Sequence, residues 1–177
     1  MILKFLSIVR VHRRIGAIHA GWLEAGGRRM PCALGRTGIG HAKREGDGLT
    51  PAGRHRLDRL WIRTDRSALR ASGLPWRATR PADGWCDDAR DARYNKPVTL
   101  PFKPSHETMW REDRLYDCVV EIGWNRHPVV KGRGSAIFLH VARPGFGPTE
   151  GCVALRRADL LRLLPRLSKR TRIVIRP

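Results

Sequence analysis

Short segments in which apolar and polar residues alternate, set apart by glycines, constrain the fold of this chain more than any other feature. Alternation with a period of two buries one face of an extended strand, and glycine supplies the turns between strands. The apolar residues of the first segment share one such face: Leu3, Phe5, Val9 and Val11. The pattern predicts strands at residues 2–11, 15–22, 28–34, 54–63, 116–122, 136–141 and 171–175.

One segment near the C-terminus has helical spacing instead. Its leucines form an apolar stripe, made of Leu160, Leu161, Leu163, Leu164 and Leu167. Asp159 lies in the first turn, where a negative charge is favourable, and Pro165 must kink or close the helix. The expected fold class is therefore mainly β (α+β), with one C-terminal helix at residues 157–167.

The chain has 177 residues, of which 41% are hydrophobic, and this suits one domain with a packed core. A glycine-rich loop is predicted at residues 35–53. The periodicity then fails at residues 64–114, a long proline-rich loop region that also contains three tryptophans. A structureless loop of that length is unusual in a compact domain. We therefore expect a single domain over residues 1–177, in which residues 64–114 form a lid or a pocket wall with short elements of their own.

The chain is strongly basic, with 35 Lys and Arg against 16 Asp and Glu and a formal net charge of +19. Such a field attracts anions, which include nucleic acid, an anionic membrane surface and an acidic polymer. A basic nucleic-acid-binding module is thus one alternative. The arginines are spread along the whole chain, however, and no nucleic-acid-binding motif is present. A basic enzyme drawn to an acidic surface accounts for the charge equally well, so no nucleic-acid partner is expected.

The four cysteines, at positions 32, 86, 118 and 152, are far apart and form no CxxC pair, which argues against a zinc ribbon. Asp87 and Asp88 lack a matching histidine cluster, so no metal site is predicted. The spacing neither requires nor excludes disulfides. We interpret Cys32, Cys86 and Cys118 as structural thiols.

The strongest candidate for a catalytic segment lies between His140 and Arg157 (HVARPGFGPTEGCVALRR). A predicted strand ends near His140, a Pro/Gly loop reverses the chain, and Gly151 precedes Cys152. Cysteine attacks as the thiolate, and a neighbouring imidazole can accept the thiol proton. The backbone amides from Gly151 to Val153 are candidate oxyanion donors. Spacing alone leaves a buried, inert cysteine and a structural histidine as alternatives.

This segment resembles the signature of the L,D-transpeptidase (YkuD-type) family, in which a histidine at a strand end is followed by a loop and Ser/Thr-x-Gly-Cys. Here these positions are His140 and Thr149-Glu150-Gly151-Cys152. A second segment, KREGDGLTPAG at residues 43–53, is similar to the family's Lys/Gly/Asp-x-Thr-Pro-x-Gly element. Val141, Glu150 and Ala154 depart from the common pattern. The resemblance therefore predicts the reaction class better than the substrate.

The resemblance implies a YkuD-like mixed β-sandwich and a cysteine-dependent acyltransferase of peptidoglycan, with stem peptides as partners and no cofactor. Cys152 attacks a stem-peptide carbonyl, His140 moves the proton, and an amine of a second stem peptide resolves the thioester to form a cross-link. Water in place of the amine gives an L,D-carboxypeptidase or endopeptidase instead. The donor is left open between the diamino acid at stem position three and the L-Ala at position one, which would give 1–3 links.

Five further side chains are candidates for binding the stem peptides: His106, Arg133, Ser135, Tyr94 and Arg143. An arginine guanidinium suits planar recognition of carboxylates. Ordinary surface turns and loops are the alternative for His106, Arg133 and Ser135. The oligomeric state is not predicted.

Peptidoglycan as substrate implies that the protein acts in the periplasm or cell envelope. Lys4 interrupts the apolar start of the chain, which therefore carries no clear signal-peptide pattern. No run of 18 apolar residues exists either, so no membrane-spanning helix is expected. The route to the envelope stays open at this stage.

Overall fold

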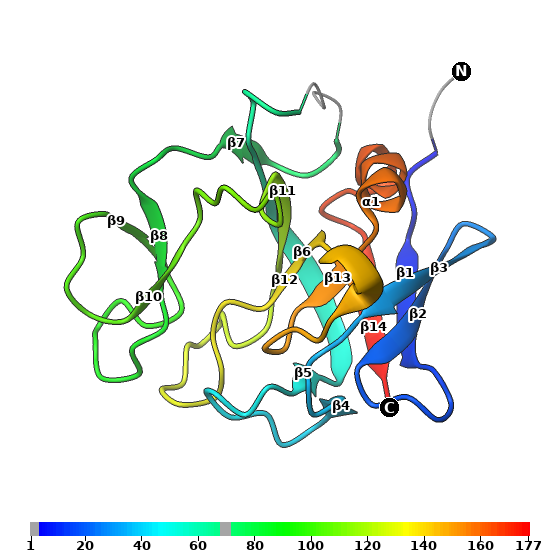
Figure 1. Ribbon diagram of the computed structural model, residues 1–177, viewed down its shortest axis with the longest axis horizontal. Helices are drawn as coiled ribbons and strands as arrows, with labels where there is room; N and C mark the ends of the chain where they lie inside the picture. The colour runs from blue at the N-terminus through cyan, green and yellow to red at the C-terminus, as the bar shows by residue number, and fades with distance from the viewer. Residues whose placement is uncertain (1–3, 68–71) are drawn as a thin grey trace.

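The structure is a computed structural model that describes residues 4–67 and 72–177 (Figure 1). Within these residues the main sheet has nine strands, which are β1 (Ile8–Arg13), β2 (Ala20–Ala25), β3 (Arg28–Ala33), β6 (Gly53–Ile62), β7 (Trp76–Ala78), β11 (Cys118–Ile122), β12 (Phe138–Val141), β13 (Val153–Leu155) and β14 (Arg172–Arg176). Their order is β11-β12-β13-β3-β2-β1-β14-β6-β7. Because β11 also pairs with β6, the sheet closes on itself like a barrel.

The interior of this barrel is apolar, and the strands alternate as their sequences predict. Val9 and Val11 of β1 are buried, as are Ile173 and Ile175 of β14, while the residues between them are more exposed. All four residues of β12 are buried, because this strand lies between β11 and β13 and is covered on both faces. The site histidine is therefore carried by one of the most enclosed strands.

The helix packs its leucine stripe against the barrel. It consists of α1 (Arg157–Leu163), followed directly by the 3-10 turn η2 (Leu164–Arg166), in which Pro165 closes the α-helix. The buried leucines of this region are Leu160, Leu163, Leu164 and Leu167. The prediction of a mainly β fold with one C-terminal helix is confirmed, with an α-helical part shorter than the predicted residues 157–167.

A second, smaller sheet lies beside the barrel (Figure 1). It consists of β10 (His106–Thr108), β8 (Asp83–Cys86) and β9 (Pro97–Thr99), in that order, and we call it the side sheet. Residues 64–114 thus contain short elements, as expected. One shorter strand pair and a turn are also present: β4 (Ile39–Gly40) pairs with β5 (Thr50–Pro51) within the glycine-rich loop, and η1 (Pro144–Phe146) is a 3-10 turn.

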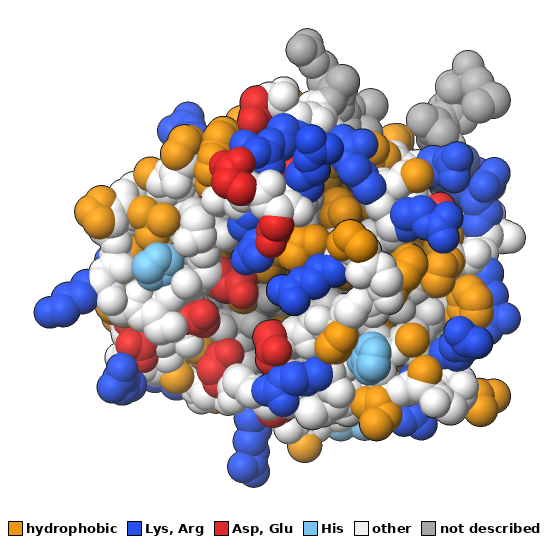
Figure 2. Space-filling view, in the orientation of Figure 1, with side chains coloured by type: hydrophobic (Ala, Val, Ile, Leu, Met, Phe, Trp, Pro, Cys, Tyr) orange, Lys and Arg blue, Asp and Glu red, His pale blue; other side chains and the backbone are white. Residues whose placement is uncertain are grey.

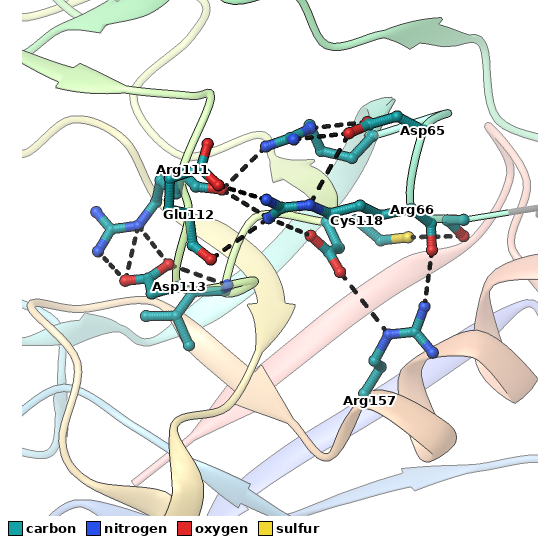
Figure 3. A network of polar contacts seen from close by, with 11 residues as sticks. Asp65, Arg66, Arg111, Glu112, Asp113, Cys118 and Arg157 are labelled. Carbon is teal, nitrogen blue, oxygen red and sulfur yellow. Dashed lines mark hydrogen bonds and ion pairs between the residues drawn. The ribbon is translucent and has the colours of Figure 1, made fainter.

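An arginine network joins the two ends of the 64–114 segment to each other and to helix α1 (Figure 3). The Arg66 guanidinium donates to the backbone carbonyl of Arg111 at 3.0 Å and to the Glu112 carboxylate at 2.5 Å. Arg157, in the first turn of α1, donates to the backbone carbonyl of Arg66 at 3.2 Å and lies 3.9 Å from the Asp117 carboxylate. This network fixes the backbone of Arg111, whose side chain borders the cavity described below.

Several predicted strand bounds were wrong at their N-terminal ends. The strand predicted at residues 2–11 begins at Ile8; Leu3 lies outside the described residues, and Phe5 is 53% exposed. The strand predicted at residues 15–22 begins at Ala20, because a turn with Gly16 at φ +78° leaves Ile15 in solvent. The segment predicted at 136–141 becomes a strand only at Phe138, since Ala136 has φ +51°. Within the described residues, no helix has both the length and the apolar character to span a membrane.

Candidate active site

Cys152 directly precedes β13 and faces the backbone that leads into β12. Its Sγ accepts a hydrogen bond from the Phe138 amide at 3.3 Å and donates to the Ala136 carbonyl at 3.2 Å. The side chain is nearly enclosed, with 7% exposure of the residue. The thiol therefore rests in a backbone cradle that binds it in its protonated form.

His140 lies in β12, where parallel pairing sets it opposite Ala154 of β13. The Nδ1 atom lies 2.8 Å from the Val141 carbonyl oxygen. A carbonyl only accepts, so Nδ1 carries the hydrogen and Nε2 keeps its lone pair. The Tyr116 ring packs edge-on against the imidazole, with centroids 5.2 Å apart. These two contacts hold the ring with its basic nitrogen free of a backbone partner.

The register of β12 and β13 directs both side chains to one face. His140 pairs with Ala154, and Cys152 lies two positions before Ala154, so alternation along the chain puts the His140 and Cys152 side chains on the same face. His140 and Cys152 accordingly line one cavity of about 310 Å³. Within the described residues no hydrogen bond joins the two side chains, because the thiol donates to Ala136. The structure brings the predicted pair together in a resting arrangement.

Burial shifts both pKa values toward the neutral forms. It raises the pKa of the Cys152 thiol to about 12, and the negative charge of Glu107 adds to this, while the Phe138 amide and Lys43 act in the opposite direction. Burial also lowers the pKa of His140 to about 4. At neutral pH the pair is thus a thiol beside a neutral imidazole, which is the form that can accept a proton from sulfur.

The residues before the cysteine are tied to one another. The Thr149 hydroxyl donates to the Cys152 carbonyl at 2.7 Å and accepts from the Gly151 amide at 3.2 Å. Gly151 has φ +128°, and a Cβ there would lie 2.7 Å from the Leu49 carbonyl oxygen, so only glycine fits. The Gly151 amide is already bonded in this arrangement, and Val153 is enclosed in β13. The assignment of oxyanion donors around Cys152 stays a prediction.

The second motif segment packs against this turn. Lys43 is buried, and its Nζ donates to Asp47 at 2.6 Å, while Asp47 also accepts from the Leu49 amide at 2.8 Å. A Cβ on Gly151 would lie 3.4 Å from the Lys43 Nζ. The two segments that carry the family resemblance therefore meet at the cysteine, and Lys43 contributes the positive charge that lowers the pKa of Cys152. The sequence marked this segment but gave no reason to single out Lys43.

The structure brings only part of the predicted binding set to the cavity. Ser135 and Arg143 line it. Tyr94 is buried, and its hydroxyl donates to Glu45, whose side chain does line the cavity. His106 instead lies within reach of the Pro104 carbonyl at 2.8 Å, and Arg133 stacks over Trp124 beside a different hollow.

Sequence reasoning missed several groups on the cavity wall, among them Asp87, Glu107 and Tyr116. Glu107 follows His106 in the chain, and the alternation of strand β10 turns the two side chains to opposite faces. Glu107 thus lies one residue from His106, the predicted contact, but on the other face of the strand. The described part of the chain contains no group of three or more His, Cys, Asp or Glu arranged to hold a metal ion.

Comparison with known proteins shows the family of the chain. The YkuD profile, described as the L,D-transpeptidase catalytic domain, matches residues 15–175. The chain belongs to the YkuD family. This confirms the resemblance seen in the two motif segments, and the mainly β fold with one short helix agrees with it. No curated protein matches the chain at a significant level.

Two solved structures are similar to this YkuD domain, and both are from Mycobacterium tuberculosis. An L,D-transpeptidase from strain H37Rv is 12% identical, with 97% of this chain and 58% of that chain covered and a TM-score of 0.45. L,D-transpeptidase 1 is 16% identical, with 95% of this chain and 61% of that chain covered and a TM-score of 0.39. The chain thus spans about three fifths of the length of these structures.

Proposed function

We propose that this protein is a peptidoglycan L,D-transpeptidase that uses Cys152 as its nucleophile and His140 as its base. One observation carries the proposal: a YkuD domain holds these two side chains on the same face of β12 and β13, in one cavity. The neutral imidazole, with Nδ1 held by the Val141 carbonyl, presents Nε2 as the proton acceptor.

In the first step a stem-peptide carbonyl enters the cavity and the thiol leaves its bond to the Ala136 carbonyl. The His140 Nε2 takes the proton from Sγ as sulfur bonds to the carbonyl carbon. The tetrahedral adduct then collapses: the C–N bond breaks, the departing amine takes the proton from His140, and a thioester remains on Cys152. Backbone amides near Cys152 are the proposed donors to the oxyanion.

In the second step the amine of another stem peptide attacks the thioester, an amide bond forms, and Cys152 is released as the thiol. Water in place of the amine would release a trimmed stem, which is the L,D-carboxypeptidase or endopeptidase alternative. Glu150 and Ala154, which depart from the common family pattern, both line the cavity. Because these departures lie where substrate binds, we propose the L-Ala at stem position one as donor, which gives 1–3 links.

The proposed place of action is the cell envelope, where peptidoglycan lies. A net charge of +19 favours association with an acidic polymer or membrane surface. His106, Arg133, Tyr94, Ser135 and Arg143 remain proposed contacts for the stem peptides, and of these Ser135 and Arg143 line the cavity of Cys152. The proposed partners are therefore a donor and an acceptor stem.

The test is incubation of the protein with purified muropeptides, wild type beside Cys152→Ala, followed by mass spectrometry. New dimers formed only by the wild type would support acyl transfer, and their fragmentation would assign the donor residue. Dimers with only 3–3 links would rule out the 1–3 assignment. Trimmed stems without dimers would favour the hydrolase, and absence of any product with tetrapeptide and pentapeptide stems would contradict the proposed function.

A further inference from the structure

The cavity of Cys152 has an acidic wall in a protein that is otherwise strongly basic. Its lining includes four carboxylates, from Glu45, Asp87, Glu107 and Glu150, against two guanidiniums. Acidic side chains gather on the face between the side sheet and the loop before β13, with Lys and Arg spread over the remainder (Figure 2). A concave wall of this sign favours a cationic group.

Glu107 is the carboxylate of this wall that is most closely tied to the reacting pair. Its Oε2 accepts a hydrogen bond from the Tyr116 hydroxyl at 2.5 Å, and the Tyr116 ring packs against His140 with centroids 5.2 Å apart. Among acidic and basic side chains, its charge acts most strongly on Cys152 and raises the pKa of the thiol. Tyr116 thus connects Glu107 to His140, and the negative charge of Glu107 acts on Cys152.

No basic side chain of the described residues forms an ion pair with the Glu107 carboxylate. Within the described residues its second oxygen accepts no hydrogen bond, and it forms no ion pair. Arg111 is the nearby cation, but its guanidinium is 2.5 Å from Asp113, which neutralises it. Asp87 adds a second negative charge, with a buried Oδ1 that has no partner in the described part of the chain. Burial, Asp87 and Asp113 raise the pKa of Glu107, while Tyr116 and Arg111 lower it.

We propose that Glu107 is the residue that binds the acceptor amine and takes its first proton, with Asp87 beside it in the same subsite. The inference rests on the proposed function, because that reaction requires a primary amine that arrives as an ammonium ion. The neutral His140 can take one proton per step, whereas an ammonium must lose two to become an amide. A carboxylate facing the thioester supplies the missing base.

The step balances as follows. The ammonium transfers one proton to the Glu107 carboxylate, and the nitrogen lone pair that this frees forms the N–C bond to the thioester carbon. The C–S bond breaks, and its electron pair leaves with the sulfur of Cys152. His140 takes the second proton from nitrogen and returns it to the thiolate. Glu107 then releases its proton to solvent, and no oxidant or further reactant is needed.

The experiment separates acylation from transfer. The protein is acylated with a disaccharide-tetrapeptide and quenched for intact mass, and the acyl-enzyme is then mixed with a disaccharide-tripeptide acceptor to follow dimer formation. Glu107→Gln is expected to form the acyl-enzyme at least as fast as the wild type but to transfer it to the amine about 10²-fold more slowly. A larger fraction of the acyl-enzyme should then be hydrolysed by water instead of being transferred to the amine. Glu24→Gln in β2, a carboxylate outside both the cavity lining and the arginine network, is the control and should change neither rate.

A pH profile distinguishes a base from a structural contact. Tyr116→Phe keeps the ring against His140 but removes the hydroxyl whose hydrogen bond lowers the pKa of Glu107, so the pH profile of transfer should move to higher pH. Glu107→Asp should restore part of the transfer rate. If Glu107→Gln transfers to the amine at the wild-type rate, or slows acylation and transfer equally, the assignment of Glu107 is wrong while the proposed function stands. If the wild type forms no acyl-enzyme, both are wrong.

Discussion

The barrel and the 64–114 segment are held together by different physics, and the active-site cavity lies where they meet. The barrel closes through a continuous strand ladder around buried side chains such as Leu60 and Val120. The 64–114 segment has short strands, and ion pairs and stacking help to hold it: Arg63 covers the Trp110 ring at 3.3 Å, and Arg77 lies 2.7 Å from Asp83. The barrel contributes Cys152 and His140, and the segment contributes Asp87, Glu107 and Arg111. The strand ladder positions Cys152, the proposed nucleophile, and the polar segment lines the cavity through which a substrate would reach it.

The largest expected effect is on the acyl-transfer rate, when a thiol in the cavity is replaced and compared with a thiol buried elsewhere. Cys152→Ala is expected to lower acyl transfer by on the order of 10³-fold or more, because no other group supplies the nucleophile. Cys118→Ala removes a buried thiol of β11 whose sulfur faces Ser67 rather than the cavity, and it should leave the rate unchanged. Dimer formation measured on both variants is the check. Equal loss in the two variants would mean that buried thiols act through packing.

Truncating a side chain in the barrel core should lower the stability of the protein. Leu60 in β6 is fully buried, and Leu60→Ala should lower the free energy of unfolding by about 3 kcal/mol through lost burial and the cavity left behind. Urea unfolding followed by tryptophan fluorescence measures this change. A loss below about 1 kcal/mol would show that the barrel core at β6 is loosely packed.

Removing the arginine network should loosen the 64–114 segment with a small effect on the barrel. Arg66→Ala loses the bonds to the Arg111 carbonyl and the Glu112 carboxylate, which should cost about 1 kcal/mol. Hydrogen exchange should rise at residues 105–114 and stay unchanged in β1 and β14. Arg170→Ala, an exposed change on the barrel side, is the control. Faster exchange throughout the barrel would contradict the separation of the two regions.

The smallest expected effect is that of pH on acylation near neutrality. His140, with a pKa of about 4, stays neutral and able to accept a proton, so the acylation rate should be flat from about pH 5.5 to 8 and fall only as the pH drops toward 4. Alkylation of Cys152 by iodoacetamide, which requires the free thiolate, should instead rise about tenfold per pH unit over this range. A plateau in alkylation at neutral pH would reveal a preformed thiolate.

The sequence predicted the individual strands and the helix better than the cavity wall, for a physical reason. Alternating residues such as Val9 and Val11 encode a buried face locally, and the leucine stripe encodes the helix in the same way. The cysteine and histidine were also readable, because one short segment carries both. Glu107 lies in a region without periodicity, and only the packing of the side sheet against the barrel sets it beside Tyr116. Such contacts join residues of different elements through tertiary packing, which local sequence periodicity does not predict.

The same limit explains the mixed outcome for the proposed binding residues. Ser135 precedes the strand that carries His140, so its place at the cavity follows from the chain. Arg133 is only two residues earlier, yet its guanidinium lies 5.8 Å from the Trp124 ring, in another hollow. Proximity in sequence to the strand that carries His140 therefore predicted the region of the cavity but not the direction of each side chain.

The most direct measurement is the mass of the protein quenched within seconds of mixing with a tetrapeptide donor, followed by peptide mapping of the adduct. The proposed chemistry predicts a mass increase equal to the donor acyl group, attached to Cys152 and absent from Cys32, Cys86 and Cys118. The adduct should disappear when an amine acceptor is added, as dimers form. An unmodified protein, or an adduct on one of the other three thiols, would contradict the assignment of Cys152 as the nucleophile.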